Sequence, residues 1–262
     1  GISNSRITTL LNKAKIPQSS IQGILISHAH GDHCNGLPVI ETNFRAPVIC
    51  SRGTQESFLR FKEYDERWGK ISREVTILNK KIPVEVGPFS IESIPTVHDI
   101  LGANAFYIKV RGIGISIITD TGKILPAQLD AMKKSSIVLI EMNHDIQLLY
   151  NSDRPKPLKQ RIRKTHLANG QTIELFDQLK NDDVLAMFLA HLSGECNSPS
   201  VVKNELACWG MNQENLPFNT YICRRDRPGT MITLSANDII KSKEQPLKLE
   251  ILRKKMTPPR DL

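Results

Sequence analysis

Three histidines and an aspartate lie together directly after a short apolar run near the start of the chain. The run, residues 24–26, has the composition of a buried strand, and the polar cluster follows at its carboxyl end, where α/β sheets usually place their sites. Imidazole and carboxylate groups suit zinc, manganese or iron, and Gly31 allows the backbone to turn tightly between them. The cluster consists of His28, His30, Asp32 and His33. It predicts a divalent metal site if further ligands come from elsewhere in the chain; otherwise it is a histidine-rich polar loop.

Other apolar segments also end at potential metal ligands. Three of these ligands, each at the end of a predicted strand, are His98, Asp120 and His191. Asp120 precedes a turn glycine, Gly122, which is where a carboxylate that bridges two metal ions would lie. All seven histidines fall in predicted loops, a position that scattered structural histidines would not share. The spacing therefore predicts that these three residues meet the first cluster at one rim of a sheet.

The apolar pattern predicts strands and helices that alternate along the chain. Residues 82–97 alternate with a period of two around Gly87-Pro88, which is typical of a hairpin. Further strands are expected at residues 24–26, 47–50, 75–78, 105–110, 113–119, 137–140 and 184–190. Helices are expected at residues 3–12, 52–69, 125–132 and 170–180, and a short one after the cluster at residues 28–33. A further helix is expected after the cap Ser198, with Val202, Leu206 and Trp209 facing inward. This order predicts an α/β fold.

The composition is that of an ordinary soluble globular protein. The chain has 262 residues, 40% of them hydrophobic and 24% charged, so we expect a single domain over residues 1–262 with a basic C-terminal extension at about 241–262. It contains no apolar window long enough to cross a membrane and no secretory signal at its start, which predicts a cytoplasmic protein without a membrane partner. Its five cysteines form no CxxC pair, so neither a disulfide framework nor a zinc knuckle is indicated.

Basic residues are concentrated just before one of the histidines. The net charge of +8 favours polyanionic partners. The basic segment, which we define as residues 154–164, runs directly into His166, so it is a candidate for contacting phosphate; a solvated surface segment is the plainer alternative. Its basic residues are Arg154, Lys156, Lys159, Arg161, Arg163 and Lys164, of which Lys159, Arg161 and Arg163 are the candidate phosphate contacts.

The ordered set of ligands resembles a known family over nearly the whole chain. The motif HxHxDH at residues 28–33, followed by His98, Asp120 and His191, resembles the metal ligands of the metallo-β-lactamase superfamily. Shorter motifs are similar to the YycJ/WalJ-type group, whose members are described as metal-dependent exonucleases: TDTG at 119–122, EMNHD at 141–145, LKQR at 158–161, THLAN at 165–169 and AHLS at 190–193. The resemblance implies a four-layer αβ/βα sandwich.

The resemblance also implies a role for each ligand in a site for two divalent ions, zinc, manganese or iron. One metal would be held by His28, His30 and His98, the second by Asp32, His33 and His191, and Asp120 would bridge them. In such sites ions about 3.5 to 4 Å apart share a water, lower its pKa towards about 7 and direct the resulting hydroxide at a phosphate. Asp32 and His166 are the implied catalytic residues, and His166 would protonate the leaving oxygen or serve a structural role. Glu141 and His144 are expected to support the ligands rather than bind metal.

The chain departs from the family pattern at several positions. Thr165 and Ala168 replace a glycine and a serine that usually flank the His166 pair, which removes a hydroxyl that could contact phosphate. Ala190 replaces a common glycine before His191. Superfamily chains begin with two strands and a turn ending in Asp-Ala-Gly, and this chain opens at what resembles that final glycine, so the sandwich is expected to lack its usual N-terminal strands.

These features predict a dinuclear metal-dependent phosphodiesterase or nuclease, with DNA or RNA as substrate and exonuclease action as the leading interpretation. A small cyclic or alkyl phosphodiester is the nearest alternative substrate. The second alternative is thioester or lactam hydrolysis with the same metals, and the third is a nucleic-acid-binding module with a degenerate site, which the intact ligand set disfavours. The sequence leaves the polarity of cleavage, the native metal and the oligomeric state open.

Overall fold

The computed structural model describes residues 1–61, 66, 75–78, 82–180, 182–211, 216–225, 229 and 232. The helix expected at residues 52–69 lies only partly within these residues. The expected C-terminal extension, residues 241–262, lies outside them. The expectation of one domain over the whole chain therefore stays a prediction.

A seven-stranded mixed sheet has the order β10-β9-β8-β7-β6-β5-β4. Its antiparallel half is formed by β4 (Val84–Val86), β5 (Phe89–Pro95), β6 (Asn104–Val110) and β7 (Ile113–Ile118). From β7 onward the pairing is parallel through β8 (Ile137–Glu141), β9 (Ala186–Ala190) and β10 (Asn219–Ile222). Because β6 reverses the chain between β5 and β7, the strands β5, β7, β8 and β9 all point the same way and their carboxyl ends share one edge.

The second sheet has three parallel strands in the order β1-β2-β3. They are β1 (Ile24–Leu25), β2 (Val48–Ser51) and β3 (Val75–Leu78). The sequence predicts a buried strand at residues 24–26, but within the described residues β1 pairs on one side only and is half-buried. The fully buried strand of this sheet is β2, in which every position is buried.

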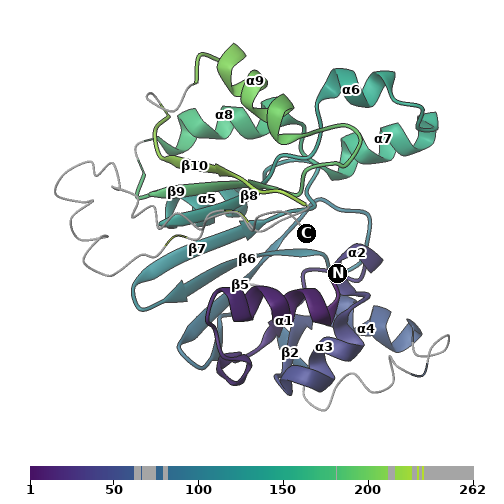
Figure 1. Ribbon diagram of the computed structural model, residues 1–262, viewed down its shortest axis with the longest axis vertical. Helices are drawn as coiled ribbons and strands as arrows, with labels where there is room; N and C mark the ends of the chain where they lie inside the picture. Colours follow the sequence, from purple (N-terminus) through teal and green to yellow (C-terminus); the bar gives the residue numbers. More distant parts are fainter. Residues whose placement is uncertain are drawn as a thin grey trace.

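The two sheets pack between two helical layers, as Figure 1 shows. Ile49 and Leu78 of the three-stranded sheet pack against Ile91 and Phe106 of the seven-stranded sheet, which places a hydrophobic layer between the sheets. The outer face of the large sheet is covered by α5 (Pro126–Lys133), α8 (Asn169–Leu179) and α9 (Pro199–Cys208). The outer face of the small sheet is covered by α2 (Gly31–Cys34), α3 (Leu37–Phe44) and α4 (Arg52–Phe61). This is the four-layer αβ/βα sandwich that the sequence predicts.

Local sequence signals account for several element boundaries. Helix α1 (Asn4–Lys13) begins where the Ser3 side chain accepts a hydrogen bond from the Arg6 backbone N–H. Ser198 caps α9 in the same way, through the Val201 backbone N–H. Gly87 joins β4 to β5 with a φ of +56°, a left-handed conformation that glycine adopts without steric cost.

Sequence periodicity misses two helices and one strand. It predicts no helix in the basic segment, yet this segment contains most of α7 (Lys156–Thr165), which follows the short α6 (Ile146–Asn151). The reason is that α7 is almost entirely polar: Ile162, buried against Leu149 of α6 and Cys196, is its main apolar anchor. β10 is also not expected from the sequence, and it forms only by parallel pairing with β9.

Two smaller expectations are wrong. Trp209, expected to face inward from α9, is half exposed because the helix ends at Cys208, whereas Val202 and Leu206 are buried. His33, expected in a loop, lies in the single turn of helix α2.

No helix that the structure describes combines the length and apolar character needed to cross a membrane. The cytoplasmic location expected from the sequence stays a prediction.

Candidate metal centre

The shared edge of the large sheet positions one half of the polar cluster. His98 follows β5, Asp120 follows β7, Glu141 is the last residue of β8, and His191 follows β9. The other half comes from the small sheet, where the chain leaves β1 and enters α2. The Asn104 backbone N–H at the start of β6 donates to Ser27 O at 3.1 Å, which ties that loop to the large sheet beside His28. Residues far apart in sequence therefore converge because strand ends from both sheets meet.

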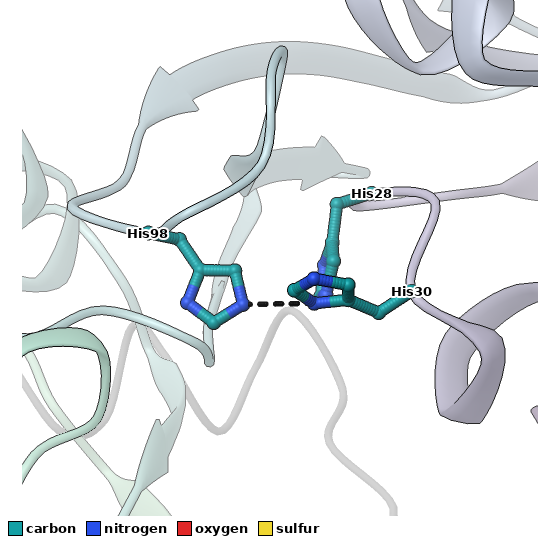
Figure 2. A group of neighbouring side chains, drawn as sticks. All are labelled: His28, His30 and His98. Atoms are coloured by element: carbon teal, nitrogen blue, oxygen red, sulfur yellow. Dashed lines mark hydrogen bonds between the residues drawn. The ribbon is translucent and has the colours of Figure 1, made fainter. Parts of the chain in front are cut away.

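His28, His30 and His98 form the first ligand group, with one nitrogen of each within 4.8 Å of the others. Figure 2 shows their rings pointing toward one another from two separate loops. His98 Nδ1 lies 3.1 Å from Thr165 O, and a carbonyl oxygen only accepts, so His98 carries its hydrogen on Nδ1. The lone pair on His98 Nε2 is then directed at His30 Nδ1, 3.1 Å away. This is how a second hydrogen bond orients a metal-binding imidazole.

Asp120 connects this group to the remaining predicted ligands. Its Oδ1 lies 3.9 Å from His98 Nε2 and 3.6 Å from His191 Nε2, and its Oδ2 lies 3.5 Å from His33 Nε2. Asp32, His33 and His191 also present ligand atoms within 4.8 Å of one another. The structure thus brings all seven predicted ligands into one cluster and places Asp120 between its two halves. Their roles as metal ligands stay a prediction.

Two residues of the cluster have left-handed backbone conformations. Asp120 has a φ of +58° and His191 a φ of +57°, a region that non-glycine residues seldom adopt. This conformation costs free energy for residues other than glycine, and such residues concentrate at functional sites. Asn143 holds the turn at His191 by donating from Nδ2 to His191 O at 2.9 Å. The geometry turns both side chains from the sheet edge toward the cluster.

Glu141 is a fully buried carboxylate that orients two of the histidines. Its Oε1 accepts from His166 Nδ1 at 2.7 Å and from His191 Nδ1 at 2.8 Å. Its Oε2 accepts from the backbone N–H groups of Thr121 and Leu167 at 3.2 and 3.4 Å. Both histidines therefore carry a hydrogen on Nδ1, and His191 directs Nε2 at Asp120. Glu141 also belongs with Asp120, His166 and His191 to a group of possible ligand atoms within 4.8 Å of one another, so its expected supporting role stays a prediction.

The electrostatic environment sets the protonation of these groups. Burial, together with the charges of neighbouring histidines beginning with His33, lowers the pKa of His28 to about 2, so its imidazole is neutral, as a metal ligand must be. Burial alone would raise the pKa of Glu141, but the hydrogen bonds from His166 and His191 outweigh it and lower that pKa to about 2. Burial alone would lower the pKa of His191, whereas its bond to Glu141 and the charge of Asp120 raise it to about 9. Metal binding at His191 therefore requires release of a proton.

Two buried atoms in the cluster support the interpretation of a cation site. Within the described residues, His28 Nε2 and Asp120 Oδ2 are buried without a hydrogen-bond partner. Unsatisfied buried polar atoms are unfavourable, and a divalent cation coordinated by imidazole and carboxylate would satisfy both. The residues present thus fit divalent metal ions in type and in unmet coordination.

The other predicted site residues differ in where they lie relative to the cluster. His166 lies between the two halves, with its ring centroid 5.2 Å from that of His98 and 5.5 Å from that of His191. Asp32 lies at the outer rim, with 74% of its side chain exposed and Oδ2 3.6 Å from His33 Nε2. His144 is buried with Nδ1 3.3 Å from Asn143 Oδ1 and belongs to none of the ligand groups in the described chain. Burial lowers the pKa of His144 to about 4.

The structure separates the three cations that the sequence marks as candidate phosphate contacts. Arg161 reaches the rim of the cluster, where it pairs with Asp99. Lys159 instead donates to Tyr150 O of α6 at 2.7 Å, and the exposed Arg163 has no partner among the described residues. Asp99 is a site residue that sequence reasoning misses, and its Oδ1 lies 3.5 Å from His98 Nε2. Its position directly after His98 in the sequence is the signal that could have identified it.

Comparisons with known proteins bear on the family and the fold of this chain. The family model described as a beta-lactamase superfamily domain matches residues 6–191. The chain is 26% identical over 200 residues to the exodeoxyribonuclease WalJ of Streptococcus pneumoniae serotype 2 (strain D39 / NCTC 7466), a match that covers 75% of this chain and 73% of the relative. It is 24% identical over 206 residues to the exodeoxyribonuclease YycJ of Bacillus anthracis, covering 78% and 76%. Among solved structures, a diphosphatase of the PhnP family superposes with a TM-score of 0.59 at 13% identity over 89% of this chain and 78% of that one.

Proposed function

The chain belongs to the β-lactamase superfamily and is a metal-dependent hydrolase, and from that premise we propose that it hydrolyses phosphodiester bonds of nucleic acid, as a DNA exonuclease in the first instance. Its similarity to two proteins named exodeoxyribonucleases supports DNA as the substrate. The basic helix α7, which leads directly into the cluster at His166, supports a polyanionic substrate independently of those names.

In this proposal the ligand groups hold two divalent ions. His28, His30 and His98 hold one, and Asp32, His33 and His191 hold the other. Asp120 contributes to both, in agreement with its position between the two halves. Divalent ions bound there would supply Lewis-acid stabilisation of a phosphate and a water of lowered pKa as nucleophile.

The protein's own groups orient the substrate and move protons. His166 donates its Nδ1 hydrogen to Glu141, so Nε2 is the nitrogen available to the substrate. A general acid needs a ring nitrogen held in a fixed direction, and the buried carboxylate of Glu141 behind this ring provides that. His166 is thus suited to be the general acid, and Glu141 fixes its ring. Because Ala168 lacks a hydroxyl, phosphate contacts must come from other groups, and the described candidate at the rim is Arg161.

The observation that carries the proposal is the continuity of α7 with the cluster. The carboxyl end of this helix is fixed in two ways. Thr165 O accepts a hydrogen bond from His98 Nδ1. Lys164 O packs so closely on Gly122 that a Cβ added to Gly122 would lie 1.7 Å from this oxygen. A cationic helix held rigidly beside candidate metal ligands can guide a phosphate backbone to the reacting atoms. Thioester and lactam substrates carry no backbone charge for such a helix to bind.

The test is digestion of end-labelled single- and double-stranded DNA and RNA, each with a 5′-phosphate or a 5′-hydroxyl, with zinc, manganese or iron supplied. The proposal expects release of mononucleotides from DNA by the wild type and none by Asp120→Asn. Bis(p-nitrophenyl) phosphate and an acyl-glutathione serve as comparison substrates. Hydrolysis of the thioester with no cleavage of any nucleic acid would refute the proposal. Hydrolysis of the small diester alone would favour a cyclic or alkyl phosphodiesterase.

A further inference from the structure

Asp99 and Arg161 form an ion pair at the rim of the metal centre. Arg161 donates through Nε to Asp99 Oδ2 and through Nη2 to Asp99 Oδ1 at 3.1 Å, so the guanidinium fork is engaged at two points. A paired fork of this kind fixes both the position and the plane of the guanidinium group.

One carboxylate oxygen links this pair to two predicted ligands. Asp99 Oδ1, which accepts from Arg161 Nη2, also lies 3.5 Å from His98 Nε2 and 3.9 Å from His30 Nε2. Both histidines belong to the first ligand group. A single carboxylate oxygen therefore lies between the guanidinium and the first ligand group.

Arg161 keeps donors for a second partner. A guanidinium has five N–H groups, and Asp99 takes one from Nε and one from Nη2, which leaves three. No partner for these three exists among the described residues. With 43% of the Arg161 side chain and 35% of the Asp99 side chain exposed, the pair is open to substrate. Arg161 also lies one turn before Thr165, whose carbonyl contacts His98, so the helix that carries it is fixed to the site.

Resting on the proposed function, we propose that Asp99 is a positioning residue that holds the Arg161 guanidinium at the rim of the metal centre, where its free N–H groups bind a non-bridging oxygen of the scissile phosphate. Lys159 and Arg163 have no such position: Lys159 is joined to Tyr150 O, and Arg163 is exposed to solvent. The three basic residues thus differ in role. Arg161 acts on the reacting phosphate, and the others act on the strand.

A double-mutant cycle with a small diester tests this assignment, because bis(p-nitrophenyl) phosphate has no strand for the other cations to bind. Removing one preorganised donor to the reacting group costs about 100-fold in catalysis, so Arg161→Ala should lower kcat/KM by that order. Asp99→Asn should lower kcat by about tenfold while KM changes little, because the cation remains but is no longer aligned. The double variant should be no worse than Arg161→Ala, since Asp99 acts through Arg161.

Chemical rescue separates positioning from a structural role. Added guanidinium ion should restore part of the activity of Arg161→Ala, and it should fail to do so in the double variant, because Asp99 supplies the binding site. Glu195→Gln is the control, since Glu195 forms an exposed ion pair with Arg154 Nε at 3.0 Å just before α7. It should leave kcat within about twofold, as surface ion pairs contribute little. Melting temperature and bound metal are measured for every variant, and kcat is expressed per metal-loaded molecule.

Several results would overturn the inference. Additive losses in the cycle, or rescue that does not depend on Asp99, would show that the two residues act separately. An Asp99→Asn variant that binds inorganic phosphate more tightly at unchanged kcat would show that Asp99 only neutralises charge. If the wild type hydrolyses no phosphodiester with any metal, the proposed function fails, and binding of inorganic phosphate to the metal-loaded protein still tests the pair: Arg161→Ala should weaken it by about tenfold or more, and unchanged binding refutes it.

Discussion

Glu141→Gln is the substitution whose consequences the structure specifies most fully. The carboxylate is fully buried and accepts four hydrogen bonds, two from histidine nitrogens and two from backbone N–H groups. Glutamine keeps one oxygen and places an NH₂ group at the other position. If the NH₂ group takes the place of Oε2, the two backbone N–H groups lose their acceptor. If it takes the place of Oε1, either the two histidine N–H groups lose theirs or both rings must move the hydrogen to Nε2, the nitrogen needed for metal.

The magnitude follows from these four hydrogen bonds. An unsatisfied buried donor costs about 1–3 kcal/mol, and removing one partner of a buried charged pair costs about 3–5 kcal/mol in total. We therefore expect Glu141→Gln to lower the free energy of unfolding of the metal-free protein by about 4 kcal/mol. Because His191 is then without the group that fixes its ring, metal affinity should fall by about 10- to 100-fold.

Urea unfolding in the presence of a chelator measures the first effect, and competition with a fluorescent chelator measures the second. Glu174→Gln, on the exposed face of α8, is the control and should change neither quantity measurably. A destabilisation of less than about 1 kcal/mol in Glu141→Gln, with metal affinity unchanged, would refute the reasoning. In that case the hydrogen bonds to His166 and His191 would not be what orients the two rings.

Three other substitutions test separate parts of the site. Gly122→Ala would place a Cβ 1.7 Å from Lys164 O, so α7 must shift. Thermal melting should show marked destabilisation, and hydrolysis should fall. Unchanged values would refute the close approach of these two segments. Asp120→Asn keeps a residue that tolerates the left-handed backbone, so circular dichroism should remain that of the wild type while hydrolysis falls by about 1,000-fold or more; retained activity would rule out the two-metal proposal. Neutralising Lys159, Arg161 and Arg163 together should flatten the salt dependence of DNA binding, by a slope of about 0.9 for each phosphate that is no longer neutralised, and an unchanged slope would make the basic segment a solvated surface.

Most of the fold could be predicted from the sequence because its strands are strongly apolar. The β4–β5 hairpin and the Ser198 cap depend on short-range patterns, and both appear in the structure where the sequence predicts them. The polar helix α7 could not be predicted in this way. Its one strongly buried apolar side chain, Ile162, is anchored by Leu149 and Cys196, which periodicity within α7 cannot reveal.

The sequence by itself determined which residue types are available for the site and where each lies relative to a strand end. Those positions depend on local chemistry, and they were enough to indicate metal ligation at His28, His98 and Asp120. Only the tertiary structure decided how these groups face one another. The left-handed turns at Asp120 and His191 and the pairing of Asp99 with Arg161 arise where two sheets and α7 meet, and such arrangements are set by packing between segments that are distant along the chain.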